Sequence, residues 1–186
     1  MSADRMSLAQ AKRAAAYIVE ALSPFCDRIE VAGSVRRERE TCKDVEIVCI
    51  PKVEIVPSLF GVDGRWRVRG FEAALDGWRR VKGSATEGRY CQRIVPFEDR
   101  EVALDLFVAV PENYGLILAI RTGSAEYSHE VLAKGWVQAG YRSKDGMLRD
   151  VNCARVEVRE EADLFRLIGL PWCEPRAREG SSTCSG

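Results

Sequence analysis

Two short stretches near the N-terminus bring together residue types that suit a metal–nucleotide site. Gly33 and Ser34 are followed after nine residues by Asp44, and Glu46 comes two positions later. Because strand side chains alternate between faces, the two carboxylates point to the same side, roughly 7 Å apart along the chain. Neighbouring carboxylates repel each other unless a cation lies between them. Magnesium is the natural candidate, since it binds carboxylate and phosphate oxygens.

A third carboxylate lies in an apolar stretch further along the chain. Asp105 is the one charged residue between Val102 and Val110, a run with the character of a central strand. Taken alone, it could be a buried Asp that is hydrogen-bonded to a loop, because a buried carboxylate without a partner is costly. Together with Asp44 and Glu46 it favours a site for two divalent ions, about 3.5–4 Å apart, of the kind used for in-line phosphoryl displacement.

The Gly33–Ser34 turn would form the phosphate-binding half of such a site. Glycine allows backbone N–H groups close to phosphate oxygens, and the Ser34 hydroxyl adds a donor. Arg36 and Arg37 follow directly, and guanidinium groups suit phosphate well. The alternative is a solvated loop with a run of charges, and the carboxylates ten and twelve residues after Ser34 argue against it.

Composition and charge set wider bounds on the protein. The 186 residues suffice for one domain or two packed subdomains, and Lys plus Arg equal Asp plus Glu at 28 each, so net charge indicates nothing about nucleic acid. We expect no membrane association and no signal peptide, because no stretch approaches about 18 apolar residues. One His and seven scattered cysteines without a C-x-x-C pair argue against zinc and for a reducing compartment, so we expect a cytoplasmic protein.

The elements around these residues predict an α+β fold, with a mixed sheet and flanking helices. The strands are expected at 29–33, 44–50, 89–95 and 102–110, with a hairpin turning at Asp145–Gly146. The helices are expected at 7–22, 71–78, 114–121, 125–139 and 160–168, the first with Ser7 and Gln10 as a capping box. We divide the chain into a first domain at 1–111, a small C-terminal α/β subdomain at 112–175 and a disordered tail at 176–186.

The combined motifs resemble the nucleotidyltransferase superfamily, whose signature is Gly-Ser, then Asp-x-Glu, then a later strand Asp. The run Gly33-Ser34-Val35-Arg36-Arg37 narrows the resemblance to the DNA polymerase X family. Thr122-Gly123-Ser124 is similar to that family's sugar-contacting turn, and 163–168 with 174–178 resembles its closing segment. The similarity runs from about residue 7 to 179. It implies a polymerase-beta-like nucleotidyltransferase palm at 1–111 and a thumb-like subdomain that contacts the nucleotide sugar at 112–175.

The resemblance also implies a reaction, in which a nucleotidyl group passes from a dNTP to a DNA primer 3′-hydroxyl and pyrophosphate leaves. Two Mg²⁺ ions, or Mn²⁺ in their place, would be the cofactors, and primer-template or gapped DNA the partner, as in repair. Asp105 would also help to deprotonate or position the 3′-hydroxyl. The implied metal ligands are Asp44, Glu46 and Asp105, and the implied nucleotide contacts are Gly33, Ser34, Arg37, Lys43, Thr122 and Gly123.

Three departures from the family pattern qualify the implied substrate. Close relatives carry Asp where this chain has Glu46, and the pair before Thr122 is Ile120–Arg121 rather than two aromatic residues. The family's amino-terminal lyase domain and helix-hairpin-helix segment are absent from the sequence, so we expect no lyase activity. The grip on DNA would then come from elsewhere, with a protein partner as one source.

The basic and aromatic stretch 65–93 is the chain's own candidate for contacting DNA, since cations and stacking rings suit nucleic acid. Its named candidates are Lys82, Arg89 and Tyr90, to which His129 is added from the turn after Gly123. For the stretch 65–93, the alternative is a helix with a solvated basic face. For His129, the alternative is a solvent-exposed histidine without a function.

The same residues are compatible with two other functions. A template-independent nucleotidyltransferase that acts on RNA, protein or a small molecule would fit the absent DNA-gripping segments. A non-catalytic accessory that binds nucleotide or DNA would fit Glu46 and the short architecture, although three retained carboxylates argue against it.

Overall fold

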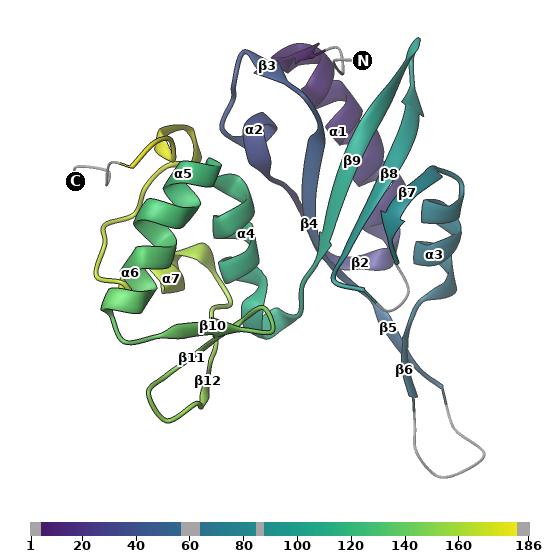
Figure 1. Ribbon diagram of the computed structural model, residues 1–186. Helices are drawn as coiled ribbons and strands as arrows, with labels where there is room; N and C mark the ends of the chain where they lie inside the picture. Colours follow the sequence, from purple (N-terminus) through teal and green to yellow (C-terminus); the bar gives the residue numbers. More distant parts are fainter. Residues whose placement is uncertain (1–4, 57–63, 85–87, 182–186) are drawn as a thin grey trace.

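The structure is a computed structural model that describes residues 5–56, 64–84 and 88–181 (Figure 1). Its N-terminal part is built on a five-stranded sheet with the strand order β2-β4-β9-β8-β7. The β4–β9 pair is parallel and the other three pairs are antiparallel, so the expected mixed sheet is confirmed. The strands are β2 Cys26–Val31, β4 Val45–Pro51, β7 Arg79–Gly83, β8 Tyr90–Phe97 and β9 Arg100–Val108.

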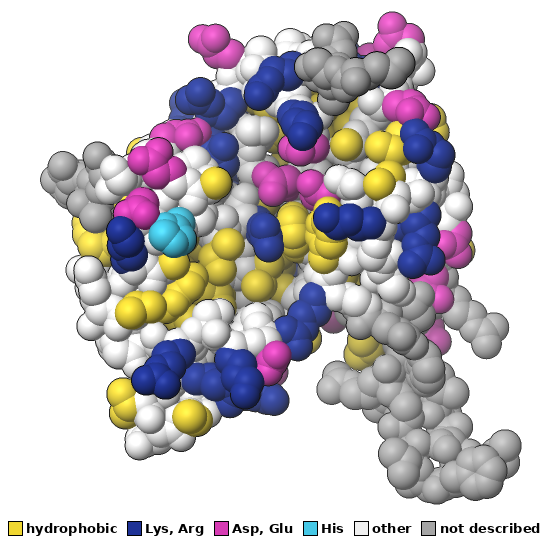
Figure 2. Space-filling view, viewed as in Figure 1, with side chains coloured by type: hydrophobic (Ala, Val, Ile, Leu, Met, Phe, Trp, Pro, Cys, Tyr) yellow, Lys and Arg dark blue, Asp and Glu magenta, His cyan; other side chains and the backbone are white. Residues whose placement is uncertain are grey.

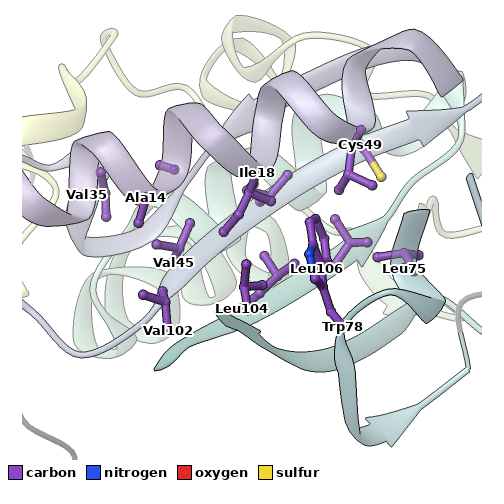
Figure 3. Packing of buried hydrophobic residues seen from close by; sticks show 14 of the residues in the cluster. Ala14, Ile18, Val35, Val45, Cys49, Leu75, Trp78, Val102, Leu104 and Leu106 are labelled. Atoms are coloured by element: carbon purple, nitrogen blue, oxygen red, sulfur yellow. The ribbon is translucent and has the colours of Figure 1, made fainter. Parts of the chain in front are cut away.

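Helices α1 (Leu8–Leu22) and α3 (Arg69–Asp76) cover one face of this sheet and close the main core (Figures 1 and 3). The predicted start of α1 is confirmed, because Ser7 and Gln10 form the capping box. Alternate residues of β4 and β9 point into this core, as the period of a strand requires. The buried side chains from helices and strands include Ala14, Ile18, Val45, Ile47, Cys49, Leu75, Trp78, Val102, Leu104 and Leu106.

Helix α4 (Tyr114–Thr122) covers only part of the opposite face. Tyr114 and Leu118 pack there against Val48 and Phe107 of the two central strands. Beyond this contact, where β4 and β9 bring Glu46 and Asp105 together, the space-filling view shows a hollow, and we call this side the open face of the sheet (Figure 2).

The C-terminal part has its own core, in which Tyr127, Leu132, Leu164 and Phe165 are buried. The helix expected at 125–139 is divided into α5 (Ala125–Tyr127), a π-helical turn (Ser128–Ala133) and α6 (Lys134–Gln138). The predicted turn at 145–146 joins β10 (Arg142–Lys144) to β11 (Met147–Arg149), and both turn residues have positive φ. The remaining elements are β12 (Arg155–Val156), α7 (Glu161–Leu167) and the 3₁₀ turn η4 (Pro175–Ala177).

Several elements were not expected from the sequence. The hairpin β5 (Val53–Val56) and β6 (Gly64–Arg67) lies between β4 and α3, and residues 57–63 between its strands lie outside the described residues. The short strands β1 (Met6–Ser7) and β3 (Thr41–Cys42) pair beside α1. Short 3₁₀ turns, η1 (Ser23–Phe25) and η2 (Pro111–Asn113), precede β2 and α4.

The chain remains packed beyond residue 175, where we expected the ordered part to end. The side chain of Arg178 is fully buried and Glu179 forms ion pairs with the first part of the molecule, while residues 182–186 of the expected tail lie outside the described ranges. Across the described chain, no helix has the length and apolar character needed to cross a membrane.

Candidate functional site

The three predicted carboxylates lie on the open face of the sheet. Asp44 directly precedes β4, and Glu46 within β4 is the register partner of Asp105 in β9. The residues on either side of Glu46 and of Asp105 point into the main core, so the carboxylates point away from it. Figure 2 shows acidic side chains gathered in the middle of this face, in the hollow between the sheet and the C-terminal helices. The parallel pairing therefore brings together residues from two distant stretches of sequence.

The carboxylates influence each other electrostatically. Burial, followed by the charges of Asp44 and Asp105, raises the pKa of Glu46 from 4.5 to about 7. Burial and then the charge of Asp105 also raise the pKa of Asp44 above its usual range. Arg121 and Arg37 act in the opposite direction on the pKa of Glu46, but their effect is smaller. Half-buried carboxylates that repel one another form a site that a divalent cation would stabilise.

The donor set fits magnesium in its chemistry, since all three side chains offer hard oxygen ligands. Within the described ranges, however, no group of three or more His, Cys, Asp or Glu side chains is already gathered in a metal-holding arrangement. The side chains would have to draw together when an ion binds.

Gly33 lies directly against the carboxylate of Glu46. A Cβ at position 33 would come within 1.9 Å of Glu46 Oε2, and the φ of Gly33 is +61°. Both observations require glycine, because a side chain would meet the carboxylate and disfavour this backbone conformation. The backbone N–H of Ala32 also donates to the carbonyl oxygen of Glu46, at 2.8 Å. The predicted turn, which opens the one-turn helix α2 (Gly33–Arg36), is thus joined to the carboxylate cluster.

Arg37 extends from this turn toward the C-terminal part. Its Nε donates to Glu179 Oε1 at 2.7 Å, and its guanidinium also donates to the carbonyl oxygen of Thr122 at 2.7 Å. A cavity of about 290 Å³ opens beside it, and Arg37 and Glu46 line one wall while Arg121 and Gly123 line the other. Four residues from both parts of the chain therefore face a common space.

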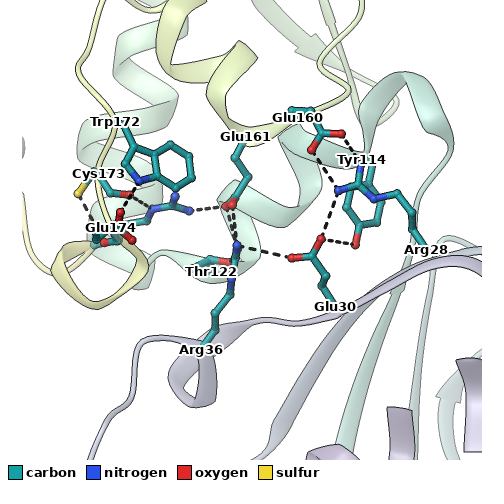
Figure 4. Close-up of polar contacts among 11 residues, drawn as sticks. Arg28, Glu30, Arg36, Tyr114, Thr122, Glu160, Glu161, Trp172, Cys173 and Glu174 are labelled. Atoms are coloured by element: carbon teal, nitrogen blue, oxygen red, sulfur yellow. Dashed lines mark hydrogen bonds and ion pairs between the residues drawn. The ribbon is translucent and has the colours of Figure 1, made fainter. Parts of the chain in front are cut away.

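Arg36 connects the two parts in a different way (Figure 4). It donates to both carboxylate oxygens of Glu161, at 2.9 and 2.7 Å, and to the hydroxyl of Thr122, at 2.7 Å. Glu161 also pairs with the fully buried Arg178, whose guanidinium lies 4.8 Å from the Trp172 ring centroid. Thr122 is itself fully buried. Its hydroxyl is therefore occupied by Arg36 rather than open to the cavity.

The other predicted nucleotide and DNA contacts are dispersed. Lys43 lines a separate cavity with Gln10 and Asp99. Arg89 donates to the carbonyl oxygen of Asp145, beside a cavity of about 660 Å³. The His129 side chain is 73% exposed and contacts Glu130.

Tyr90 is the one DNA-contact candidate that reaches the carboxylate cluster. Its hydroxyl donates to Asp105 Oδ1 at 2.6 Å, and the ammonium of Lys82 lies 5.1 Å from its ring centroid. Gln92 donates to the same oxygen at 2.9 Å. Sequence reasoning did not connect Tyr90 or Gln92 with Asp105, although their positions on alternate residues of one strand put them on one face.

Comparison with known proteins adds one finding about the C-terminal part. Residues 117–179, about a third of the chain, match the family model DNA polymerase beta thumb. This segment begins within α4 and ends at Glu179, the partner of Arg37. A search of curated proteins found no match. Residues 117–179 are therefore similar to a DNA polymerase beta thumb domain, and this supports, for this part of the chain, the resemblance to the DNA polymerase X family.

Proposed function

We propose that this chain is a small family X-like DNA polymerase, which transfers a nucleotidyl group from a dNTP to the 3′-hydroxyl of a DNA primer. One observation carries the proposal. Glu46 of the carboxylate cluster and Arg37, which follows the Gly33 turn, line one cavity together with Arg121 and Gly123, and these last two residues lie in the segment that matches the DNA polymerase beta thumb. In this proposal residues 1–111 act as the nucleotidyltransferase palm, and gap filling in repair is the role that fits a primer-extending enzyme.

Asp44, Glu46 and Asp105 would hold two Mg²⁺ ions, with Mn²⁺ as the alternative. Bound ions would supply charge neutralisation and Lewis-acid stabilisation to the phosphoryl group. The O3′–Pα bond forms, the bond from Pα to the bridging oxygen breaks, and pyrophosphate leaves with that electron pair. The carboxylate of Asp105 receives the hydroxyl proton.

Arg37 is the phosphate-binding side chain of this proposal. A planar guanidinium suits the oxygens of a triphosphate, and that of Arg37 lines the cavity together with Gly123. Its present partner is the carboxylate of Glu179. Nucleotide binding therefore requires that a phosphate replace Glu179 as the acceptor. The Thr122 side chain is buried and its hydroxyl is bonded to Arg36. In this proposal the contact to the sugar therefore comes from the backbone at Gly123.

Binding of DNA is proposed for the cleft between the two parts, since a thumb domain of this family implies a DNA partner. Basic side chains gather over the β10–β11–β12 hairpin below the hollow (Figure 2). Arg89, Arg149 and Arg155 line the cavity at that place together with Glu112, Asp145 and Glu157, and the arginine side chains are the ones that suit phosphates. A protein partner that supplies further DNA contacts is part of this proposal.

The test is a one-nucleotide gapped duplex offered with Mg²⁺ or Mn²⁺ and each dNTP in turn. We expect incorporation that follows the templating base, and a loss of at least about 100-fold in Asp105→Asn, because the proton acceptor is removed. Incorporation that ignores the template would favour the template-independent transferase instead. No pyrophosphate release with any acceptor would refute the proposal of an enzyme.

A second function, a nucleotide- or DNA-binding accessory without turnover, is favoured by one observation. The Arg37 guanidinium, which is the proposed phosphate ligand, is already bonded to the carboxylate of Glu179 and to the carbonyl oxygen of Thr122. Calorimetric titration of dNTP with Mg²⁺ into the wild type and Asp105→Asn separates the two functions. An accessory would bind nucleotide and release no pyrophosphate.

A further inference from the structure

Two side chains of β8 hold one oxygen of Asp105. Tyr90 Oη lies 2.6 Å and Gln92 Nε2 lies 2.9 Å from Asp105 Oδ1. Oδ2 takes part in neither of these hydrogen bonds. A carboxylate that accepts two hydrogen bonds on one oxygen cannot rotate freely about its last bond, so its other oxygen keeps a fixed direction.

The strand register explains why these donors reach Asp105. Gln92 is the direct cross-strand partner of Asp105 in the antiparallel β8–β9 pair. Tyr90 lies two residues earlier on the same face, where its partner is Phe107. The diagonal from Tyr90 to Asp105 is within reach of an aromatic side chain. Both donors therefore come from regular strand positions rather than from a loop.

The ring of Tyr90 is itself held in place. Its centroid lies 5.1 Å from that of Phe107, at an interplanar angle of 31°. Lys82 lies over its other side at 5.1 Å, and the guanidinium of Arg121 lies 4.0 Å from the Phe107 centroid. The Tyr90 ring thus has the Phe107 ring and the Lys82 ammonium as neighbours, and Arg121 in turn packs on Phe107. These contacts restrict where the Tyr90 hydroxyl can point.

We propose that Tyr90 and Gln92 are positioning residues, which fix the Asp105 carboxylate so that Oδ2 is presented to the cation and to the acceptor hydroxyl. This rests on the proposed function, since it assigns to Asp105 the roles given above. It also changes the role expected for Tyr90, from a contact to DNA to a contact within the protein. Residues that orient a metal ligand commonly change metal affinity or activity by about 10–100-fold when they are replaced.

The experiment uses the full chain with the substitutions Tyr90→Phe and Gln92→Met, which remove the donors and keep the side-chain volume. Tyr17→Phe is the matched control, since Tyr17 is on α1, across the sheet, where it packs on Phe97. Mn²⁺ binding is measured by the electron paramagnetic resonance signal of the free ion, and kcat and KM for dNTP in the gapped-duplex assay. Thermal unfolding verifies that each variant is folded.

We expect Tyr90→Phe to weaken Mn²⁺ binding and lower kcat about 10-fold each, with KM for dNTP within twofold of the wild type. The double variant should lose more, and Tyr17→Phe should lose nothing. In an Asp105→Asn background the effect of Tyr90→Phe on Mn²⁺ binding should vanish, because the second carboxylate oxygen, which Tyr90 is proposed to orient toward the ion, is then an amide nitrogen that cannot bind it.

The outcomes separate this inference from the proposed function. Wild-type Mn²⁺ binding without transfer would refute the polymerase, while the Mn²⁺ titrations would still decide the roles of Tyr90 and Gln92. Mn²⁺ affinity and kcat equal to those of the wild type in both variants would overturn the positioning role. The same loss in the Asp105→Asn background would overturn it too, since the effect would then not pass through Asp105. A wild type that binds no Mn²⁺ would overturn both proposals.

Discussion

Replacing Glu46 with Gln should stabilise the metal-free protein at pH 8 and leave its stability nearly unchanged at pH 4. Burial and the neighbouring carboxylates raise the pKa of Glu46 from 4.5 to about 7 in the folded protein. The folded state therefore binds the proton more tightly than the unfolded state. As the pH rises from about 4.5 to about 7, the wild type loses the stability that this proton supplies, and above pH 7 it stays without it. Glutamine has no proton to lose.

The size of the effect follows from the same pKa. A tenfold change in proton affinity corresponds to about 1.4 kcal/mol, so the free energy of unfolding at pH 8 should rise by at most about 3 kcal/mol. For a chain of this length, each kcal/mol shifts Tm by about 2–4 °C. Differential scanning calorimetry in EDTA at pH 4, 6 and 8 should then give a difference in Tm that grows with pH.

Glu20→Gln is the control, because Glu20 is exposed on α1, away from the carboxylate cluster. Its Tm should follow that of the wild type at each pH. Added Mg²⁺ should raise the Tm of the wild type at pH 8 more than that of Glu46→Gln, since the variant has lost one carboxylate ligand. A Glu46→Gln protein that is no more stable than the wild type at pH 8 would show that Glu46 is not destabilised by its surroundings, and the reasoning would fail.

Two further substitutions test the connections around the site. Glu161→Gln should lower the free energy of unfolding in urea by about 3–5 kcal/mol, because it leaves the charge of the fully buried Arg178 without a carboxylate; a loss below about 1 kcal/mol would contradict this account. Gly33→Ala should weaken dNTP binding in a calorimetric titration and lower stability by about 1–3 kcal/mol, because its Cβ meets Glu46 and its φ is positive; unchanged nucleotide affinity would mean that the turn does not touch the ligand.

Local pattern predicted the parts of the site that depend on one stretch of chain. The period of two in β4 puts Asp44 and Glu46 on one face, and the isolated charge in β9 marks Asp105 as a residue with a partner. Gly33 was expected to let phosphate oxygens approach the backbone, which stays a prediction, and the structure adds that the Glu46 carboxylate lies against it. Ser7 predicted the start of α1, because a capping box is encoded within four residues.

The contacts that were missed depend on distant parts of the chain. The hydrogen bond from Tyr90 to Asp105 was missed, because it depends on the register of β8 against β9, which composition does not encode. From its basic and aromatic neighbours, Tyr90 was interpreted as a DNA contact instead. Arg178 lies in a polar stretch whose composition predicts disorder, and its buried side chain pairs with Glu161 of α7, a distant partner that composition does not reveal. The β7 strand was missed because most of its side chains are exposed and charged, so it has no apolar alternation.

Because β4 and β9 run parallel, the chain between them must return to the end of the sheet where β4 begins. Strands β5 to β8 lie on this connection, and two of them, β7 and β8, join the same sheet. During synthesis Asp44 and Glu46 emerge long before Asp105. Until β9 inserts between β4 and β8, Asp44 and Glu46 lack the third carboxylate, and the sheet lacks its central strand. We expect nascent or truncated chains that end before residue 100 to bind no metal at this place, because the three carboxylates come together only when β9 arrives.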